Sequence, residues 1–210
     1  MKLRVEGISK ELKHRKILDN ISMEMESGKI YGLCGKNGSG KTMLLRAIAG
    51  LMKVDEGHIY IGERQLGKDF SVLPSLGLII ENAGLYPNLT GYENLKYLAD
   101  IKKRIRKEEM LTALVKVGLD PDDKRTYLKY SLGMKQRLLI AQAIMEKPDV
   151  LLLDEPTNGL DKNGVDLIRN ILKEEKERGA LIVITSHNRE DIDFLADERF
   201  VIEDGKLEKI

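Results

Sequence analysis

The apolar residues of this chain gather in short runs that predict buried strands. Residues 30–34, 150–153 and 181–184 are almost wholly apolar, which is typical of strands covered on both faces of a parallel sheet. Residues 43–49 and 161–178 instead carry apolar side chains at helical spacing, and a glycine follows each of these segments. Buried strands that alternate with helices predict an α/β fold with a parallel core.

A second pattern predicts antiparallel strands near both ends of the chain. Apolar and polar residues alternate at residues 3–8 and in the second half of residues 17–26, and a further strand is expected at residues 58–62. Residues 10–16 are expected to form a basic loop. Residues 200–210, with an Asp-Gly pair in the middle, predict a closing hairpin. The expected architecture is therefore a mixed sheet with an N-terminal antiparallel β-subdomain.

Residues of about 90–145 have a mostly helical pattern. Thr90 and Glu93 have the spacing of a capping box at a helix start. The basic residues between 102 and 107 are expected on a solvated helix face. A further apolar stripe, expected to form a local core, comprises Met110, Leu111, Leu114 and Val117. We therefore expect a single domain of residues 1–210 that contains a helical insertion.

Composition and charge exclude several classes of protein. Lys+Arg number 35 and Asp+Glu 34, so the formal net charge of +1 gives no electrostatic case for nucleic acid as a partner. The single cysteine, Cys34, allows no internal disulfide and fits a reducing compartment. No signal-peptide pattern occurs, and no apolar run approaches the roughly 18 residues that a membrane helix needs. A soluble, cytosolic chain is expected.

Residues 35–42 read G-x-x-x-x-G-K-T, the pattern of a phosphate-binding loop. A predicted strand precedes the loop and a predicted helix follows it, which indicates a P-loop NTPase core rather than a glycine-rich turn that matches by chance. Lys41 would reach the β- and γ-phosphates, and the Thr42 hydroxyl would bind Mg²⁺. The predicted nucleotide-binding residues of this segment are Gly35, Lys36, Asn37, Gly38, Ser39, Gly40, Lys41, Thr42 and Met43.

Two carboxylates end the apolar run at residues 150–153. Asp154, at the carboxyl end of a buried strand, can hold Mg²⁺ through water, and Glu155 can polarise an attacking water. The alternative is an Asp-Glu helix cap, which Pro156 and the phosphate loop make less favourable. This pair predicts nucleotide hydrolysis.

With these motifs the chain resembles the nucleotide-binding subunits of ATP-binding cassette transporters. Four further segments match in the order of the family: residues 80–82 at the Q-loop, 130–137 at the signature, 158–161 at the D-loop, and His187 at the switch histidine. The resemblance implies a head-to-tail dimer in which Ser131 and Gly133 of one subunit contact the γ-phosphate of ATP bound by the other. It also implies that Glu155 orients water, that His187 contacts the γ-phosphate, and that Glu81 joins Thr42 and Asp154 around Mg²⁺.

The chain departs from the family pattern at four positions. Leu132 and Met134 stand in the signature where Gly and Gln are usual, Glu81 replaces the usual Gln, and Leu12 lies where an aromatic residue normally stacks on adenine. The combination resembles bacitracin-resistance and lantibiotic-export subunits. It implies ATP hydrolysis that powers export of a small molecule or peptide through a separate membrane subunit. The chain would then be cytoplasmic and peripheral on the inner face of the membrane.

The coupling surface of such a subunit is expected at residues 81–92, with Leu85, Tyr86 and Leu89 exposed for a membrane partner. The alternative is that these side chains pack on the chain's own helical insertion. Two other functions stay open from the sequence. One is a soluble ATPase of the same family, acting in translation or DNA repair, and the other is a phosphate-loop kinase, which would not explain the signature segment. ATP is preferred to GTP because no N-K-x-D segment is present.

Overall fold

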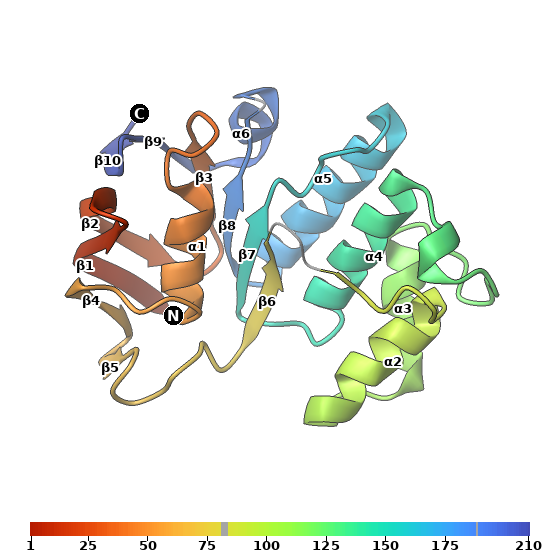
Figure 1. Cartoon of the computed structure of the whole chain (residues 1–210). Helices are drawn as coiled ribbons and strands as arrows, with labels where there is room; N and C mark the ends of the chain where they lie inside the picture. Colours follow the sequence, from red (N-terminus) through yellow and green to blue (C-terminus); the bar gives the residue numbers. More distant parts are fainter. Residues whose placement is uncertain (81–83, 188) are drawn as a thin grey trace.

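The computed structural model describes residues 1–80, 84–187 and 189–210, and within these ranges the strands form two sheets (Figure 1). The larger sheet has the order β10-β9-β3-β8-β7-β6. Within this sheet, each pair of neighbouring strands from β9 to β6 is parallel, and β10 pairs antiparallel with β9. Its strands are β3 (Ile30–Cys34), β6 (Leu76–Ile79), β7 (Val150–Asp154), β8 (Leu181–Thr185), β9 (Glu198–Glu203) and β10 (Lys206–Lys209). The predicted α/β fold with a parallel core is confirmed, and so is the closing hairpin.

The smaller sheet is antiparallel and comes from the N-terminal part of the chain. It has the order β2-β1-β4-β5, formed by β1 (Lys2–Leu12), β2 (Arg15–Glu26), β4 (Glu56–Ile61) and β5 (Arg64–Gln65). The predicted basic loop at residues 10–16 is wrong, because β1 and β2 continue to a two-residue turn. Lys13 and His14 both adopt positive φ there, 49° and 62°, which matches the twist of a tight hairpin. Neither residue is the glycine or asparagine that usually marks such a turn.

Helix α1 (Lys41–Ala49) lies between the two sheets (Figure 1). One hydrophobic cluster joins its buried face to the antiparallel sheet and to alternate residues of the central strands, including Leu33, Leu152 and Val183. Gly50 ends the helix in the left-handed conformation, with φ 83°, and its N–H bonds back to the helix. The phosphate loop at the start of α1 is therefore anchored on a rigid, fully packed helix.

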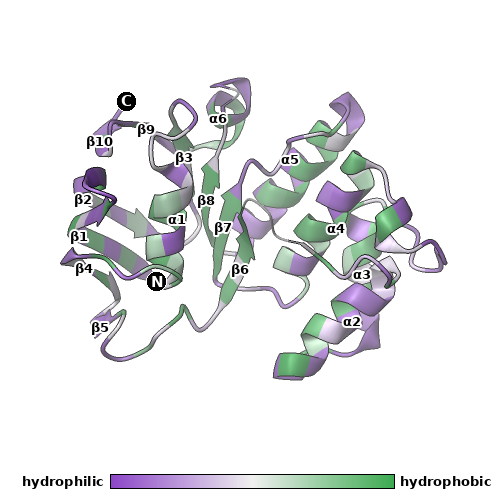
Figure 2. Cartoon of the chain, in the orientation of Figure 1, coloured by the Kyte–Doolittle hydropathy of each residue, from purple (hydrophilic) through white to green (hydrophobic). Residues whose placement is uncertain are grey.

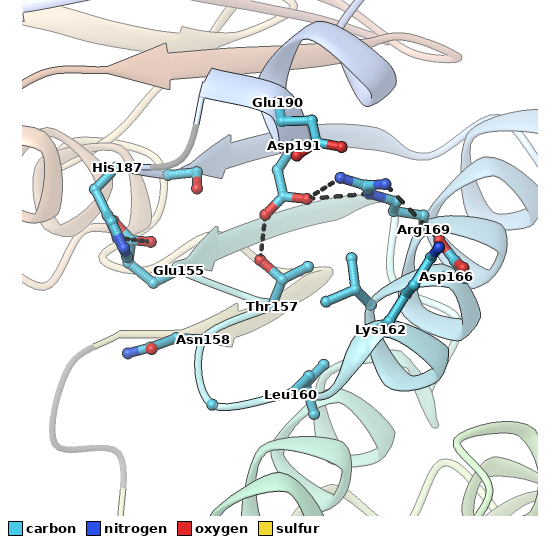
Figure 3. A pocket seen from close by; sticks show the side chains of 13 residues that line it. Glu155, Thr157, Asn158, Leu160, Lys162, Asp166, Arg169, His187, Glu190 and Asp191 are labelled. Carbon is cyan, nitrogen blue, oxygen red and sulfur yellow. Dashed lines mark hydrogen bonds and ion pairs between the residues drawn. The ribbon is translucent and has the colours of Figure 1, made fainter.

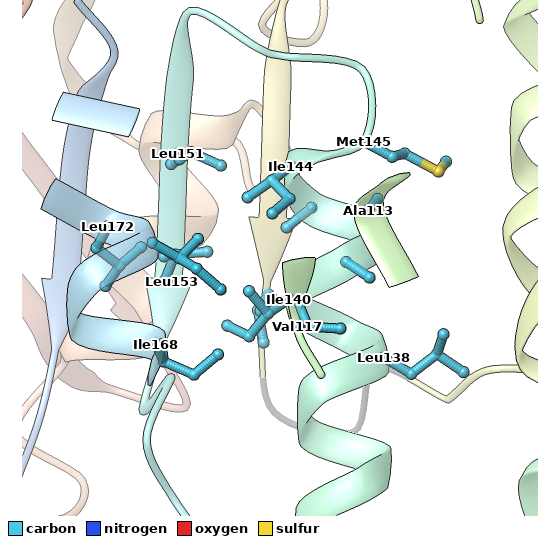
Figure 4. Packing of buried hydrophobic residues seen from close by; sticks show 14 of the residues in the cluster. Ala113, Val117, Leu138, Ile140, Ile144, Met145, Leu151, Leu153, Ile168 and Leu172 are labelled. Atoms are coloured by element: carbon cyan, nitrogen blue, oxygen red, sulfur yellow. The ribbon is translucent and has the colours of Figure 1, made fainter. Parts of the chain in front are cut away.

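The other face of the central strands packs against α4 (Leu132–Ile144), α5 (Lys162–Glu177) and α6 (Arg189–Leu195). Figure 4 shows Ile140 and Ile144 of α4 facing Leu151 and Leu153 of β7, with Leu172 of α5 alongside. The two residue sets of β7 alternate between the two clusters, which explains why this strand is apolar throughout. Figure 2 shows the central strands β6, β7 and β8 mostly in the colour of hydrophobic residues.

The helical segment predicted at residues 90–145 contains α2 (Gly91–Lys102), α3 (Lys107–Lys116), a short 3₁₀ turn at Tyr127–Lys129, and α4. The capping box is present, with Thr90 and Glu93 bonded reciprocally at the start of α2. Met110, Leu114 and Val117 are buried in the same cluster as β7, so this segment shares its core with the sheet. That residues 1–210 form one domain stays a prediction.

The basic residues between 102 and 107 do not form the predicted helix face. Lys103 ends α2 with a left-handed backbone of φ 52°, and Arg106 precedes α3 in extended conformation. Glu109 accepts a hydrogen bond from the Arg106 backbone N–H at 2.9 Å and so caps the new helix. These residues therefore lie at the junction between α2 and α3, and all the basic residues among them are exposed to solvent.

Candidate nucleotide-binding site

The predicted phosphate loop connects β3 to α1, and its glycines are required by its geometry. Gly35 and Gly40 adopt φ of 151° and 113°. A Cβ at Gly35 would lie 2.4 Å from the Ile202 carbonyl oxygen, and one at Gly40 would lie 2.7 Å from the Ile17 carbonyl oxygen. Neither position has room for a side chain, so the loop can follow this path only with glycine.

The side chain of Lys41 lies inside the loop that it follows. It is 7% exposed, and its ammonium donates to the carbonyl oxygens of Gly35 at 2.7 Å and Lys36 at 3.1 Å. These bonds fix the positive charge at the mouth of a loop whose middle residues, Asn37 and Gly38, are exposed. Lys41 is thus placed where a phosphate bound by the loop would meet it.

The loop contains donors that a phosphate would satisfy. The Ser39 hydroxyl is buried and has no hydrogen-bond partner among the residues that the structure describes. The first N–H groups of an α-helix have no partner within the helix, and within the described residues no side chain caps α1. These N–H groups carry the positive end of the helix dipole. The site therefore fits an anion of phosphate size and charge.

Thr42 and Asp154 form the link between the loop and the central sheet. The Thr42 hydroxyl donates to Asp154 Oδ2 at 2.6 Å, and the Thr185 hydroxyl donates to Asp154 Oδ1 at 2.5 Å. Thr185 is the register partner of Asp154 on the neighbouring strand. Because the Thr42 hydroxyl donates its only proton to Asp154, its lone pairs are directed elsewhere and can bind a cation.

The donor set at Thr42 and Asp154 suits Mg²⁺. Among the residues described, no group of three or more His, Cys, Asp or Glu side chains could hold a metal by itself. Mg²⁺ is usually bound by one or two protein oxygens together with waters and substrate phosphates. A threonine hydroxyl and a carboxylate beside a phosphate loop match that requirement. Glu81, the third predicted ligand, lies outside the described residues.

Glu155 has a strained backbone that several neighbours hold in place. Its φ is 50°, a left-handed conformation that costs a non-glycine residue about 1–3 kcal/mol. Its N–H bonds to the carbonyl oxygen and the hydroxyl of Thr185, at 3.2 Å and 3.1 Å. Its carbonyl oxygen accepts from Gln136. Strain of this kind is common at functional sites, where the surroundings impose it.

The Glu155 carboxylate contacts His187, as Figure 3 shows. Oε2 of Glu155 lies 2.8 Å from Nδ1 of His187. An ionised carboxylate only accepts, so Nδ1 carries the proton in this contact, and Nε2 is left for another partner. His187 is 62% exposed at its side chain and Glu155 is 18% exposed. The pair thus presents one imidazole nitrogen to solvent while the carboxylate is partly shielded.

His187 also connects two cavities. One, of about 470 Å³, is lined by Gly35, Lys36, Asn37 and His187 and lies beside the phosphate loop. The other, of about 430 Å³, is lined by Glu155, Asn158 and His187 and by residues of α5 and α6 (Figure 3). The structure therefore places His187 beside the loop and Glu155 in contact with His187.

The signature residues lie elsewhere in the same chain. Ser131 is the N-cap of α4 and is exposed, with its hydroxyl accepting from the Met134 N–H at 3.2 Å. Neither Ser131 nor Gly133 lines the two cavities described above. Leu132 is 68% exposed and packs on Gly159. A Cβ added at Gly159 would lie 2.5 Å from Cδ2 of Leu132. Ser131 thus begins α4 with an exposed helix N-terminus.

The structure also gives the burial of the remaining positions that the sequence singled out. Leu12, where an adenine-stacking residue was expected, is 46% exposed near the turn of the β1–β2 hairpin. Cys34 is buried, and burial raises the pKa of its thiol, which fits a core residue. Leu85 and Leu89 are only half-buried, and Leu85 packs on the main core, so their predicted exposure is wrong. Tyr86 is exposed as predicted.

Sequence reasoning missed a buried ionic network in the wall of the cavity of Figure 3. Asp191 accepts from Thr157 Oγ1 at 2.6 Å and from Arg169 Nε at 3.0 Å, and all three residues are buried. Thr157 follows Glu155 by two positions, Arg169 lies on α5 and Asp191 on α6. No pattern in the sequence around these residues predicts these contacts. Thr185 could have been found, because it ends an apolar strand beside the one that Asp154 ends.

Comparisons with known proteins agree with this site. Residues 18–158 match the family described as ABC transporter. The chain is 52% identical to the "Uncharacterized ABC transporter ATP-binding protein YybJ" of Bacillus subtilis, covering 98% of this chain and 94% of that protein. It is 40% identical to the "Bacitracin transport ATP-binding protein BcrA" of Enterococcus faecalis, covering 98% and 67%. It is 38% identical to the "Lantibiotic transport ATP-binding protein SrtF" of Streptococcus pyogenes, covering 98% and 88%.

A solved structure shows the same fold. The structure described as "Dimeric Structure of MJ0796, a Bacterial ABC Transporter Cassette" superimposes with a TM-score of 0.87 at 24% identity, covering 99% of this chain and 98% of the other. The chain belongs to the ABC transporter family, as one of its ATP-binding cassettes. The family and the ATPase class predicted from the sequence are thereby confirmed.

Proposed function

We propose that the chain binds Mg·ATP between two copies of itself and uses its hydrolysis to power export through a separate membrane subunit. One observation carries the hydrolytic part. A continuous hydrogen-bonded chain runs from Thr42 through Asp154, Thr185 and Glu155 to His187. It joins the phosphate loop, the two central strands and the exposed imidazole in one rigid unit.

Each residue of this unit has a task that its contacts support. The loop N–H groups, Ser39 and Lys41 hold the phosphates, and Thr42 and Asp154 hold the metal. Mg²⁺, when bound, neutralises the charge that develops on the transferred phosphoryl group. Glu155 orients a water and accepts its proton, and its shielded carboxylate favours that role. His187 has Nε2 left to contact the γ-phosphate, because its Nδ1 bonds to Glu155.

The second copy is proposed because two residues of the signature, Ser131 and Gly133, have no task at the site of their own chain. Ser131 and Gly133 begin α4 with an exposed helix N-terminus, which favours an anion. They line neither cavity beside the phosphate loop and Glu155. A head-to-tail pair would bring them to the γ-phosphate of the other copy. The solved MJ0796 cassette described as dimeric has the same fold.

The membrane partner is proposed from an exposed aromatic pair. Tyr86 and Tyr97 meet edge to face with ring centroids 4.5 Å apart, and they are 46% and 49% exposed. Asn94 supports the loop beneath them, because its buried amide bonds to the backbone N–H and carbonyl of Tyr86. In the part of the chain that the structure describes, no helix is long and apolar enough to cross a bilayer. One exposed ring on this loop and one on α2 suit docking to another protein.

The proposed cargo rests on the names of two relatives, and the proposed location rests on the proposed membrane partner. BcrA is named for bacitracin transport and SrtF for lantibiotic transport. We infer a peptide antimicrobial or a similar small molecule as cargo, and a place on the cytoplasmic face of the membrane.

The test is co-purification of the full chain with membranes of its own cells, followed by identification of the bound membrane protein. Tyr86→Glu is expected to lose membrane association while ATP binding by the isolated chain persists. Val115→Glu is the matched control, since Val115 is 62% exposed on α3 and lies far from this loop in sequence. If the wild-type chain captures no membrane protein, the transport proposal fails and a soluble ATPase of the same family takes its place.

A further inference from the structure

The backbone of Glu155 needs support from outside its own strand. Its φ of 50° is left-handed, and the next residue is Pro156, which restricts the residue before it and has no N–H to contribute. The Glu155 carbonyl oxygen accepts from the Asn158 N–H at 3.1 Å in the turn that follows, whereas the Pro156 carbonyl oxygen needs a donor from elsewhere in the fold. The direction of the Glu155 carboxylate depends on how this dipeptide is held.

One side chain donates to both carbonyl oxygens. Nε2 of Gln136 donates to the carbonyl oxygen of Glu155 at 3.2 Å and to that of Pro156 at 3.0 Å. A primary amide has two N–H groups, so a single glutamine can make both bonds at once. Gln136 is half-buried on α4, five residues after Ser131, and it makes this contact across 19 residues of sequence.

The same turns of α4 contact the segment after Glu155 at two further points. Leu132 packs on Gly159, and Arg137 lies 3.6 Å from the carboxylate of Asp161. Among these contacts only that of Gln136 reaches Glu155 itself. The helix that presents Ser131 to a second molecule is thus bonded to the backbone of the carboxylate that serves its own loop.

We propose that Gln136 is a positioning residue for ATP hydrolysis, which fixes the left-handed backbone of Glu155 and so aims its carboxylate. Gln136 acts through Glu155, and within the residues that the structure describes its side chain makes no hydrogen bond to the phosphate loop. The inference rests on the proposed role of Glu155 as the residue that orients water. It predicts an effect on kcat that is separate from nucleotide binding and from folding.

The test compares Gln136→Met with Gln142→Met. Methionine keeps the length and helix propensity of glutamine but removes the donor. Gln142 lies six residues further along α4, is half-buried and lines a cavity with Leu76 and Leu98, away from Glu155. We expect Gln136→Met to lower kcat about tenfold to hundredfold, with KM and the melting temperature close to those of the control. Gln142→Met is expected to keep the wild-type kcat.

A double-mutant cycle with Glu155→Gln separates positioning from other causes. If Gln136 acts through Glu155, Gln136→Met causes no further loss of the residual turnover in the Glu155→Gln background. An equal loss in both backgrounds would overturn the inference, and so would a wild-type kcat for Gln136→Met. If Glu155→Gln itself keeps the wild-type kcat, the proposed role of Glu155 fails, and the inference fails with it.

A second substitution covers the case in which Gln136→Met folds poorly. Gln136→Lys restores a donor that can reach both carbonyl oxygens, and it is expected to recover most of the kcat that methionine loses. A lysine variant that folds normally and is as slow as the methionine variant would contradict the hydrogen-bond origin of the effect.

Discussion

Thr42 and Asp154 are 112 positions apart in the sequence, and the Thr42 hydroxyl lies 2.6 Å from Oδ2 of Asp154. This hydrogen bond joins the first turn of α1 to the end of β7. Both elements are packed on their flanks, so neither end of the bond can move independently. Thr42 and Asp154 would thus present a preformed site to a metal bound beside the phosphate loop.

The first prediction concerns the Thr42 hydroxyl. Thr42→Val keeps the branched shape and removes the proposed metal ligand, whereas Thr42→Ser keeps the ligand. We expect the increase in ATP affinity caused by Mg²⁺ to disappear in the valine variant, and kcat to fall about a hundredfold or more. The measurement is an ATP titration with and without Mg²⁺. Equal Mg²⁺ dependence in the valine and serine variants would remove Thr42 from the metal site.

The second prediction separates the two sides of one nucleotide. Lys41 serves the loop of its own chain, and Ser131 is proposed to serve the other copy. Lys41→Ala is expected to weaken ATP binding by a single chain, while Ser131→Ala leaves that binding nearly intact and impairs association of two chains. Titration at low protein concentration and sedimentation in ATP measure the two effects. Equal loss of single-chain affinity in both variants would contradict the head-to-tail arrangement.

The third prediction concerns stability at the buried network. Asp191 is 4% exposed and holds Arg169 and Thr157, so Asp191→Ala leaves a buried arginine without its carboxylate. Loss of one partner of a buried pair costs about 3–5 kcal/mol. Asp166→Ala is the control, because Asp166 lies 3.8 Å from the same arginine with its side chain 55% exposed. Its cost should stay below about 1 kcal/mol in denaturant titrations. Equal costs would show that burial does not decide the effect.

The fourth prediction is a dependence of stability on pH. Hydrogen bonds from Lys209 and Lys29 lower the pKa of Glu198 below its ordinary value of 4.5. A carboxyl group whose pKa is lowered in the folded state stabilises the fold above its unfolded pKa, and that contribution is lost as the pH falls through the folded pKa.

Glu198→Gln should therefore lower the free energy of unfolding at pH 7, and its difference from the wild type should shrink as the pH falls below 4.5. Glu63→Gln, at an exposed position, serves as the control. A difference between the Glu198 variant and the wild type that stays constant with pH would exclude the ionised carboxylate as its cause.

Much of the fold and the site could be predicted because their signals are local. The loop from Gly35 to Thr42 carries its own geometry in its glycines, and the strand before Asp154 is apolar throughout because both its faces are covered. Capping at Thr90 and the helix stop at Gly50 are likewise decided within a few residues. Such features depend little on what the rest of the chain does.

The features that sequence reasoning missed depend on partners far along the chain. The bonds of Gln136 to the Glu155–Pro156 dipeptide and of Asp191 to Thr157 arise only after α4 and α6 dock on the sheet. Lys13 and His14 adopt positive φ because the pairing of β1 with β2 imposes that conformation on the turn. Non-glycine residues otherwise favour negative φ. No pattern of apolar residues encodes these contacts.

The central claim is that Glu155 drives hydrolysis of ATP held between two copies of the chain. Its most direct test is the Glu155→Gln variant, examined for ATP turnover and for mass in solution with ATP and with ADP. We expect ATP binding to persist, turnover to fall about 10²–10⁴-fold, and a dimer to accumulate with ATP but not with ADP. Turnover at the wild-type rate, or a chain that stays monomeric with ATP bound, would contradict the claim.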